Sequence, residues 1–135
     1  MKLTNLEVLS AVQGLGALSQ KKMGLKTAWK VTTALRSLES FAKAADETMK
    51  DIRNKYAVLD ANGNPLQAVN EKGESIPNTV QIPNAKIPLF NKEMEDFMKL
   101  EVEVHNVQFK LEDFPEGLEL EPSVLLSISP LLLQD

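Results

Sequence analysis

Residues 28–56, AWKVTTALRSLESFAKAADETMKDIRNKY, carry the strongest structural pattern in this sequence. Their apolar side chains recur alternately three and four residues apart, which is the heptad period of a left-handed coiled coil. No glycine or proline interrupts the stretch. The pattern therefore predicts one continuous helix of about 30 residues, about 45 Å long at 1.5 Å per residue. The apolar seam of this helix consists of Ala28, Val31, Leu35, Leu38, Ala42, Ala45, Met49, Ile52 and Tyr56.

A shorter amphipathic helix is predicted before the long one. Thr4 and Glu7 have the T-x-x-E spacing of a capping box, so we expect the helix to begin at about Thr4 and to run for about 17 residues. Gly14 and Gly16 lower its helix propensity, and they would let another backbone approach it closely. Two helices in sequence predict a helical hairpin over residues 1–57.

The first helix is too short to cover the whole apolar seam of the second. Either C-terminal segments of the same chain or a second copy of the chain must therefore pack on the other half of the seam, and the sequence leaves both alternatives open. If a second copy covers the seam, the expected interface residues are Leu35, Leu38, Ala42, Ala45, Met49 and Ile52.

The segment after the long helix contains the twelve-residue stretch DANGNPLQAVNE, residues 60–71. Its oxygen-bearing side chains have the spacing of a calcium loop, but Pro65 stands where such a loop needs glycine, and Gly63 comes two residues too early. Asn-Gly between short apolar runs favours a hairpin turn instead. Further along, Thr79–Ile82 is typical of a short strand, and the prolines of residues 58–90 predict extended loops.

The last third of the chain predicts short elements of both kinds. Asn91 can cap a short helix. Residues 101–111 alternate like a strand whose phase slips at His105–Asn106, which indicates a bend there. Pro122 fits the first position of a short helix that Pro130 ends, and the apolar residues 131–133 are expected to pack on the core or on a neighbouring subunit.

These elements predict a single α+β domain over residues 1–135. It comprises a long helical hairpin (1–57), a small antiparallel sheet or hairpin region with proline-rich loops (58–90), and a segment with a short helix, a strand and a C-terminal helix (91–135).

The residue content argues against catalysis and metal binding. The chain has no cysteine, and His105 is its only histidine, so neither a thiolate nor a multi-histidine metal site can be built within one chain. No glycine-rich phosphate loop and no G-x-S-x-G motif occurs. We therefore expect a non-enzymatic protein without a metal or cofactor. The start of the sequence lacks an unbroken apolar run, so no membrane association is expected and a cytoplasmic location is the natural interpretation.

Charge is distributed unevenly along the chain. Residues 1–90 hold 12 Lys and Arg against 8 Asp and Glu, whereas residues 91–135 hold 3 against 11. The two parts either have differently solvated faces or attract each other, within one chain or between copies. An acidic surface that imitates nucleic acid would fit the same balance. Binding to nucleic acid itself is not expected, because the net charge of the protein is −4.

One cluster of side chains suggests a ligand site. Lysines gather where the first helix gives way to the second, and the only tryptophan stands beside them. Ammonium groups near a helix N-terminus with an aromatic face are components of a phosphate or nucleotide site, although they also suit an ordinary solvated helix end. The candidate ligand-binding residues are Lys21, Lys22, Lys26, Trp29 and Lys30.

The order of three stretches resembles a known family. These are KYAVLDANGNPL at 55–66, LEVEVHNVQFKLEDF at 100–114 and LELEPSVLLSISPLL at 118–132, following two N-terminal amphipathic helices. In this order they resemble small phage and prophage proteins that share a domain of unknown function and are common in viruses of Gram-positive bacteria. The resemblance implies a virus-encoded accessory protein inside the host cell. It implies no catalytic or binding residues.

Two functions follow as expectations. The first is a homo-oligomeric, non-enzymatic interaction protein that binds a host or viral protein. The second is a small-ligand binder that sequesters a phosphorylated molecule, such as a nucleotide signal used in anti-phage defence.

Overall fold

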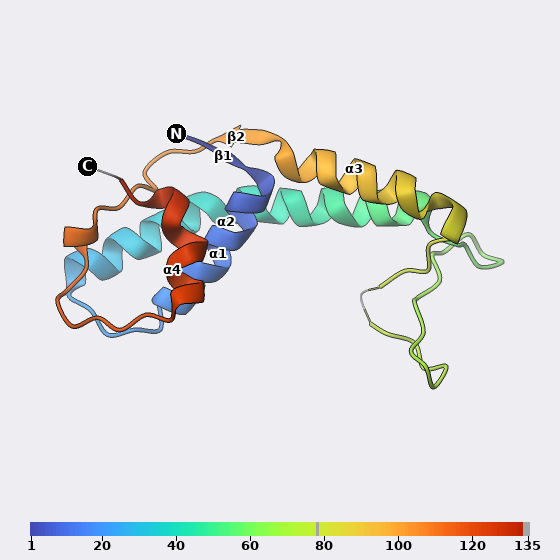
Figure 1. Cartoon of the computed structure of the whole chain (residues 1–135), viewed down its shortest axis with the longest axis horizontal. Helices are drawn as coiled ribbons and strands as arrows, with labels where there is room; N and C mark the ends of the chain where they lie inside the picture. Colours follow the sequence, from blue (N-terminus) through green and yellow to red (C-terminus); the bar gives the residue numbers. More distant parts are fainter. Residues whose placement is uncertain (78, 134–135) are drawn as a thin grey trace. The chain divides into compact units, whose positions relative to one another are not determined.

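The computed structural model describes residues 1–77 and 79–133 and has the predicted α+β fold (Figure 1). The chain forms two compact units. Unit 1 contains residues 1–45 and the C-terminal segment from residue 98, and unit 2 contains residues 46–97. The regular elements are β1 (Lys2–Thr4), α1 (Asn5–Leu18), α2 (Leu25–Tyr56), α3 (Ile87–Lys99), β2 (Glu101–Glu103) and α4 (Pro122–Ile128), with 3-10 turns η1 (Asn84–Lys86), η2 (Leu111–Asp113) and η3 (Ser129–Leu131).

The long helix α2 is uninterrupted, as its heptad pattern predicts, and its N-terminal part belongs to unit 1 and the remainder to unit 2. The apolar seam is covered within the single chain. Leu38, Ala42, Ala45 and Ile52 are buried, and Leu35 and Met49 are half-buried. The four buried side chains therefore give no reason to expect a second copy on the seam, whereas Leu35 and Met49 keep partial exposure.

The start of α1 is fixed by the capping box expected at this position. The backbone N–H of Glu7 donates to Thr4 Oγ1 at 3.1 Å, and the N–H of Thr4 donates to Glu7 Oε1 at 2.9 Å. These two bonds satisfy donors that a helix N-terminus otherwise leaves unpaired. The helix ends at Leu18, a few residues earlier than the sequence suggests.

Helix α1 packs closely on α4 in unit 1. A Cβ at Gly14 would lie 2.7 Å from Cβ of Ser127 and 2.8 Å from Cγ2 of Ile128, so this crossing requires a glycine. No atom lies within 4 Å of the corresponding position at Gly16. The close approach that both glycines suggested is therefore confirmed at Gly14 only.

The small sheet pairs β1 with β2 in antiparallel register, with Leu3 opposite Val102. Strand β2 was expected from its alternating pattern, whereas β1 is a partner that the sequence analysis missed. The main core of unit 1 lies beneath this pair and between α1, the start of α2 and α4. Its buried members are Leu3, Val8, Ala11, Leu15, Leu18, Val31, Ala34, Leu38, Ala42, Val104, Val107, Phe109, Ile128 and Leu131.

The bend predicted after β2 is present. Asn106 has a φ of 60°, a left-handed conformation that asparagine tolerates better than most residues. In a regular strand Val104 and Val107 would point to opposite faces, because they are three residues apart. The bend at Asn106 lies between them, which explains how both side chains are buried. Beyond the bend, the predicted long strand is reduced to a single bridge between Phe109 and Leu132.

The C-terminal elements agree with the sequence pattern. Pro122 opens α4, where its missing N–H costs no helical hydrogen bond, and the helix ends at Ile128. Leu131 is fully buried in the core cluster. The expectation that this apolar segment packs on the core is thereby confirmed for residue 131.

Unit 2 contains two equivalent turns ten residues apart, a repeat that the sequence analysis missed. In the first, Asp60 Oδ1 accepts hydrogen bonds from the backbone N–H groups of residues 62 and 64, and Gly63 has a φ of 81°. In the second, Asn70 Oδ1 accepts from the N–H groups of residues 72 and 74, and Gly73 has a φ of 79°. The N–H of Gly63 also donates to the Asp60 carbonyl at 3.0 Å, so the interpretation of this stretch as a turn is confirmed.

Two further expectations for unit 2 are wrong. Thr79–Ile82 is not a strand, although the backbone of Gln81 bonds to Val58 and Leu66. Helix α3 begins at Ile87 and not at Asn91. Pro88 is compatible with this earlier start. The N–H groups in the first turn of a helix have no partner within the helix, so the N–H group that proline lacks is not missed there.

Candidate functional site

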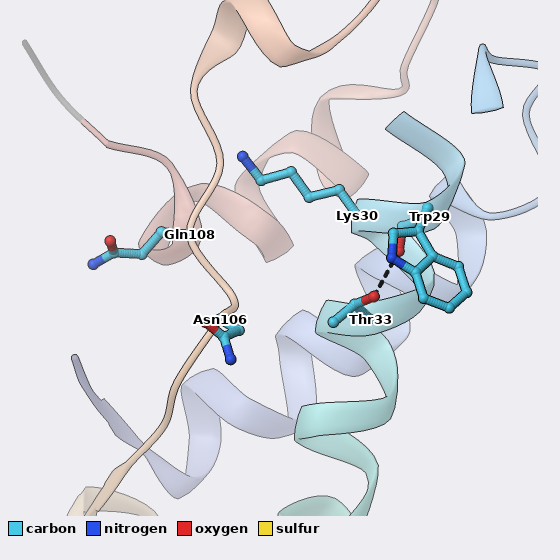
Figure 2. A pocket seen from close by; sticks show the side chains of 5 residues that line it. All are labelled: Trp29, Lys30, Thr33, Asn106 and Gln108. Atoms are coloured by element: carbon cyan, nitrogen blue, oxygen red, sulfur yellow. Dashed lines mark hydrogen bonds between the residues drawn. The ribbon is translucent and has the colours of Figure 1, made fainter. Parts of the chain in front are cut away.

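The first candidate site is a pocket in unit 1, the Trp29 pocket, which encloses about 460 Å³. Its lining residues come from two elements that face each other (Figure 2). Trp29, Lys30 and Thr33 lie on α2, and Asn106 and Gln108 lie on the extended segment after β2. Trp29 is 63% exposed and is not part of the buried core. Ring face, ammonium, hydroxyl and two amides together can bind a planar molecule with polar edges.

The ammonium group of Lys30 is held by contacts with two residues that do not line the Trp29 pocket. Its ammonium forms an ion pair with Asp113 and lies 5.4 Å from the centre of the Phe109 ring. The pKa of the Asp113 carboxyl lies below its usual range, because the backbone N–H of Lys110 and then the Lys30 ammonium donate to it. Thr27 also donates to the Asp113 backbone carbonyl at 2.7 Å. The charge of Lys30 is therefore largely committed to Asp113, which weakens the case for an ion pair with a ligand phosphate.

The structure separates the five candidate residues that the sequence placed together. Trp29 and Lys30 share the Trp29 pocket. Lys21 and Lys22 line a different cavity of about 360 Å³, together with residues 115–119. Lys26 is exposed on the first turn of α2 and lines neither cavity. Asn106, Thr33 and Gln108 were missed, and only the phase slip at 105–106 pointed to that region.

The second candidate site is a groove in unit 1, the acidic groove, which encloses about 630 Å³. Half-buried apolar side chains form its floor, and Phe114 anchors this floor by stacking on the buried Phe109 with ring centres 5.5 Å apart. Leu111 and Leu125 stand at its rim and are 68% and 42% exposed. The groove is lined by Leu111, Glu112, Phe114, Pro115, Glu116, Leu118, Leu120 and Leu125.

A tight turn shapes one wall of the acidic groove. Gly117 has a φ of 81°, and the N–H of Leu118 donates to the carbonyl of Pro115 at 3.3 Å. This turn returns the chain so that residues on both sides of Gly117 line the same groove. Residues 111–125 contain five acidic side chains and no basic one. Because only Asp113 of these is held by Lys30, the groove combines apolar lining with net negative charge.

Within residues 1–77 and 79–133, no three histidine, aspartate or glutamate side chains come together as a metal ion would require. None of the helices in this part of the chain has both the length and the apolar composition of a membrane span.

Comparison with known proteins gives no relative for this chain: no family model, curated protein or solved structure matches it.

Proposed function

We propose that this protein is a non-enzymatic interaction protein, encoded by a phage and acting as a homo-oligomer in the host cytoplasm, where it binds a host or viral protein. The observation that supports this most directly is the acidic groove. It presents apolar side chains on a fixed floor, which is the composition of a protein-binding surface rather than of a reaction centre.

Exposed apolar surface of this kind needs a reason in a folded chain. Single exposed leucines are ordinary, but a hollow surrounded by apolar side chains is a common feature of protein-binding sites. In the acidic groove, Leu111 and Leu125 stand at the rim while Phe114 is held in place from below. A partner side chain entering the groove would gain apolar contact without first having to order its floor.

Capture from host lysate by the tagged protein, followed by mass spectrometry, tests this function. Leu125→Asp should abolish capture of the partner, because it removes an apolar contact at the groove rim and puts a hydrated carboxylate in its place. Leu126→Asp is the matched control, since Leu126 neighbours Leu125, is 73% exposed and lies outside the groove lining. Capture that is equal for both variants would contradict a role for the groove, and the absence of any captured protein would contradict the function.

A second function is supported by the Trp29 pocket, namely binding and sequestration of a small molecule such as a nucleotide signal. An exposed indole can stack on a nucleobase, and the polar side chains across the pocket from it can bond to the edge of the base. Since the charge of Lys30 is shared with Asp113, the base would contribute more to binding than the phosphate.

Ligand binding can be followed with the intrinsic fluorescence of Trp29, because it is the only tryptophan. A stacked base should quench this emission, and Gln108→Ala should weaken the quenching without unfolding the protein. The panel should include mono-, di- and cyclic nucleotides. Unchanged emission with every member of the panel would exclude this second function for nucleotides.

A further inference from the structure

We propose that the acidic groove receives a basic segment from a second copy of this chain, so that two copies form a symmetric dimer. The inserted segment is the basic turn, defined here as Lys21, Lys22, Leu25 and Lys26, with Leu25 entering the groove. This inference rests on the proposed function, since it assigns an occupant to the same interaction surface.

The basic turn has the features of an inserting segment. Leu25 is 86% exposed, the highest exposure among the large apolar side chains of the described residues 1–77 and 79–133. The three lysines around it are exposed. None of them forms an ion pair with another residue in that part of the chain. An apolar anchor is thus surrounded by lysines that hold no ion pair in the described residues, although Lys21 and Lys22 line a cavity with Glu116 and Glu119 of the same chain.

The acidic groove has the complementary features. Its lining contains Glu112 and Glu116 and no basic residue, and its interior is apolar. Glu112 is exposed and meets only Lys110, at 4.0 Å, while Glu116 has no ion pair within residues 1–77 and 79–133. Burial of Leu25 against Phe114, Leu118 and Leu120 would supply apolar contact, and the opposed charges would guide the encounter.

The same molecule does not place its own Leu25 in its own groove. Lys21 and Lys22 line the neighbouring cavity with residues 115–119, so the basic turn and the acidic groove lie side by side on unit 1. Leu25 lines neither hollow and remains exposed. Adjacent patches of opposite charge are what a two-fold interface needs, because rotation places each patch of one copy on the opposite patch of the other.

The uneven charge of the sequence supports a second copy as the occupant. The acidic excess of residues 91–135 and the basic excess of residues 1–90 can neutralise each other across such an interface, in both directions at once. A foreign partner would have to bring a similar basic segment, whereas every copy of this chain already carries one.

Complementary charge reversal tests the dimer. Glu112→Lys with Glu116→Lys forms the groove variant, and Lys22→Glu with Lys26→Glu forms the turn variant. All four side chains are exposed and lie outside the core, so both variants should keep the fold, which circular dichroism checks. Light scattering should find wild type as a dimer. Each variant alone should be monomeric, with dimer affinity reduced roughly tenfold or more.

An equal mixture of the two variants should yield a heterodimer. In one of its contacts the new lysines of the groove variant meet the new glutamates of the turn variant, and in the other contact both surfaces are those of wild type. Its stability should fall as salt is raised, since exposed charges are screened. Leu25→Asp should also give a monomer, whereas Leu126→Asp should remain a dimer.

A wild type that stays monomeric at high concentration would overturn this inference, as would a groove variant that remains a dimer. These failures differ from failure of the proposed function. If wild type is monomeric but lysate capture still depends on Leu125, the groove binds another protein. The second copy as occupant and the homo-oligomer are then excluded, whereas the binding of a host or viral protein through the groove stands.

Discussion

Gly14 of α1 faces Ile128 of α4 so closely that a Cβ on the glycine would lie 2.8 Å from the isoleucine Cγ2. The buried faces of two helices of unit 1 meet at this point. The distance is shorter than ordinary carbon contact, so any side chain at position 14 must displace α4 or its neighbours.

Gly14→Ala should therefore destabilise the protein by about 1–3 kcal/mol, the usual cost of overpacking a core. Gly16→Ala is the matched control in the same helix. Because nothing lies within 4 Å of its added Cβ, it should be neutral or stabilise by up to about 1 kcal/mol through helix propensity. Urea unfolding followed by circular dichroism measures both values. Equal effects would contradict the close crossing.

Leu38→Ala should lower the free energy of unfolding by about 2–5 kcal/mol, as for a leucine removed from a packed core. Leu38 is fully buried in unit 1, although the sequence placed it among possible interface residues. The subunit number measured by light scattering should not change at concentrations where the variant is folded. A stable variant that loses its oligomeric state would restore the seam as an interface.

Asp113 should make stability depend on pH. Its folded pKa is depressed, so its contribution is present above the unfolded pKa of about 3.9 and is lost as pH falls through the folded value. Asp113→Asn removes the titrating group. Its stability should therefore decline less between neutral pH and pH values below the unfolded pKa than that of wild type, in parallel urea titrations. Identical declines would show that the carboxylate contributes no pH-dependent stability.

Glu93 should behave in the same direction within unit 2. Its pKa is lowered because Tyr56 and then Lys55 donate hydrogen bonds to the carboxylate. Protonation in acid should weaken these contacts, and the amides near the end of α2 should then exchange hydrogen faster. Glu93→Gln should show little of this acid-induced change. Protection that is independent of pH in wild type would argue against the contact.

Gly63→Ala and Gly73→Ala should each destabilise the repeated turns by about 1 kcal/mol or more, because both glycines have a positive φ that a Cβ disfavours. Gly63→Asn should cost less, since asparagine tolerates this conformation. Hydrogen exchange of the backbone N–H groups that bond to Asp60 and Asn70 measures the local effect. Similar exchange in the alanine and asparagine variants would be inconsistent with these turn geometries.

Local patterns were sufficient to predict several elements correctly. The heptad period gave α2 as one helix, the Thr4–Glu7 spacing gave the start of α1, and Pro122 gave the start of α4. The phase slip beside Asn106 marked the bend. Each of these depends on residues close in sequence, whose conformational preferences and short-range hydrogen bonds operate wherever the segment lies.

Contacts between distant residues could not be obtained in this way. Three residues of β1 have no distinctive pattern, and their pairing with β2 joins segments about 100 residues apart. The coverage of the α2 seam also depends on which distant segments fold onto it. For the same reason the sequence grouped five candidate ligand residues that the fold distributes over separate surfaces.

Local patterns were enough to place the start of α1, the continuity of α2, the start of α4 and the bend beside Asn106, because those features arise from hydrogen bonds and steric limits within a few residues. Which apolar side chains are buried and which stay exposed depends instead on the complete fold. In the folded chain Leu38 is fully buried, whereas Leu25 is exposed. Burial depends on what the rest of the chain can bring against a side chain, and that is a property of the whole fold.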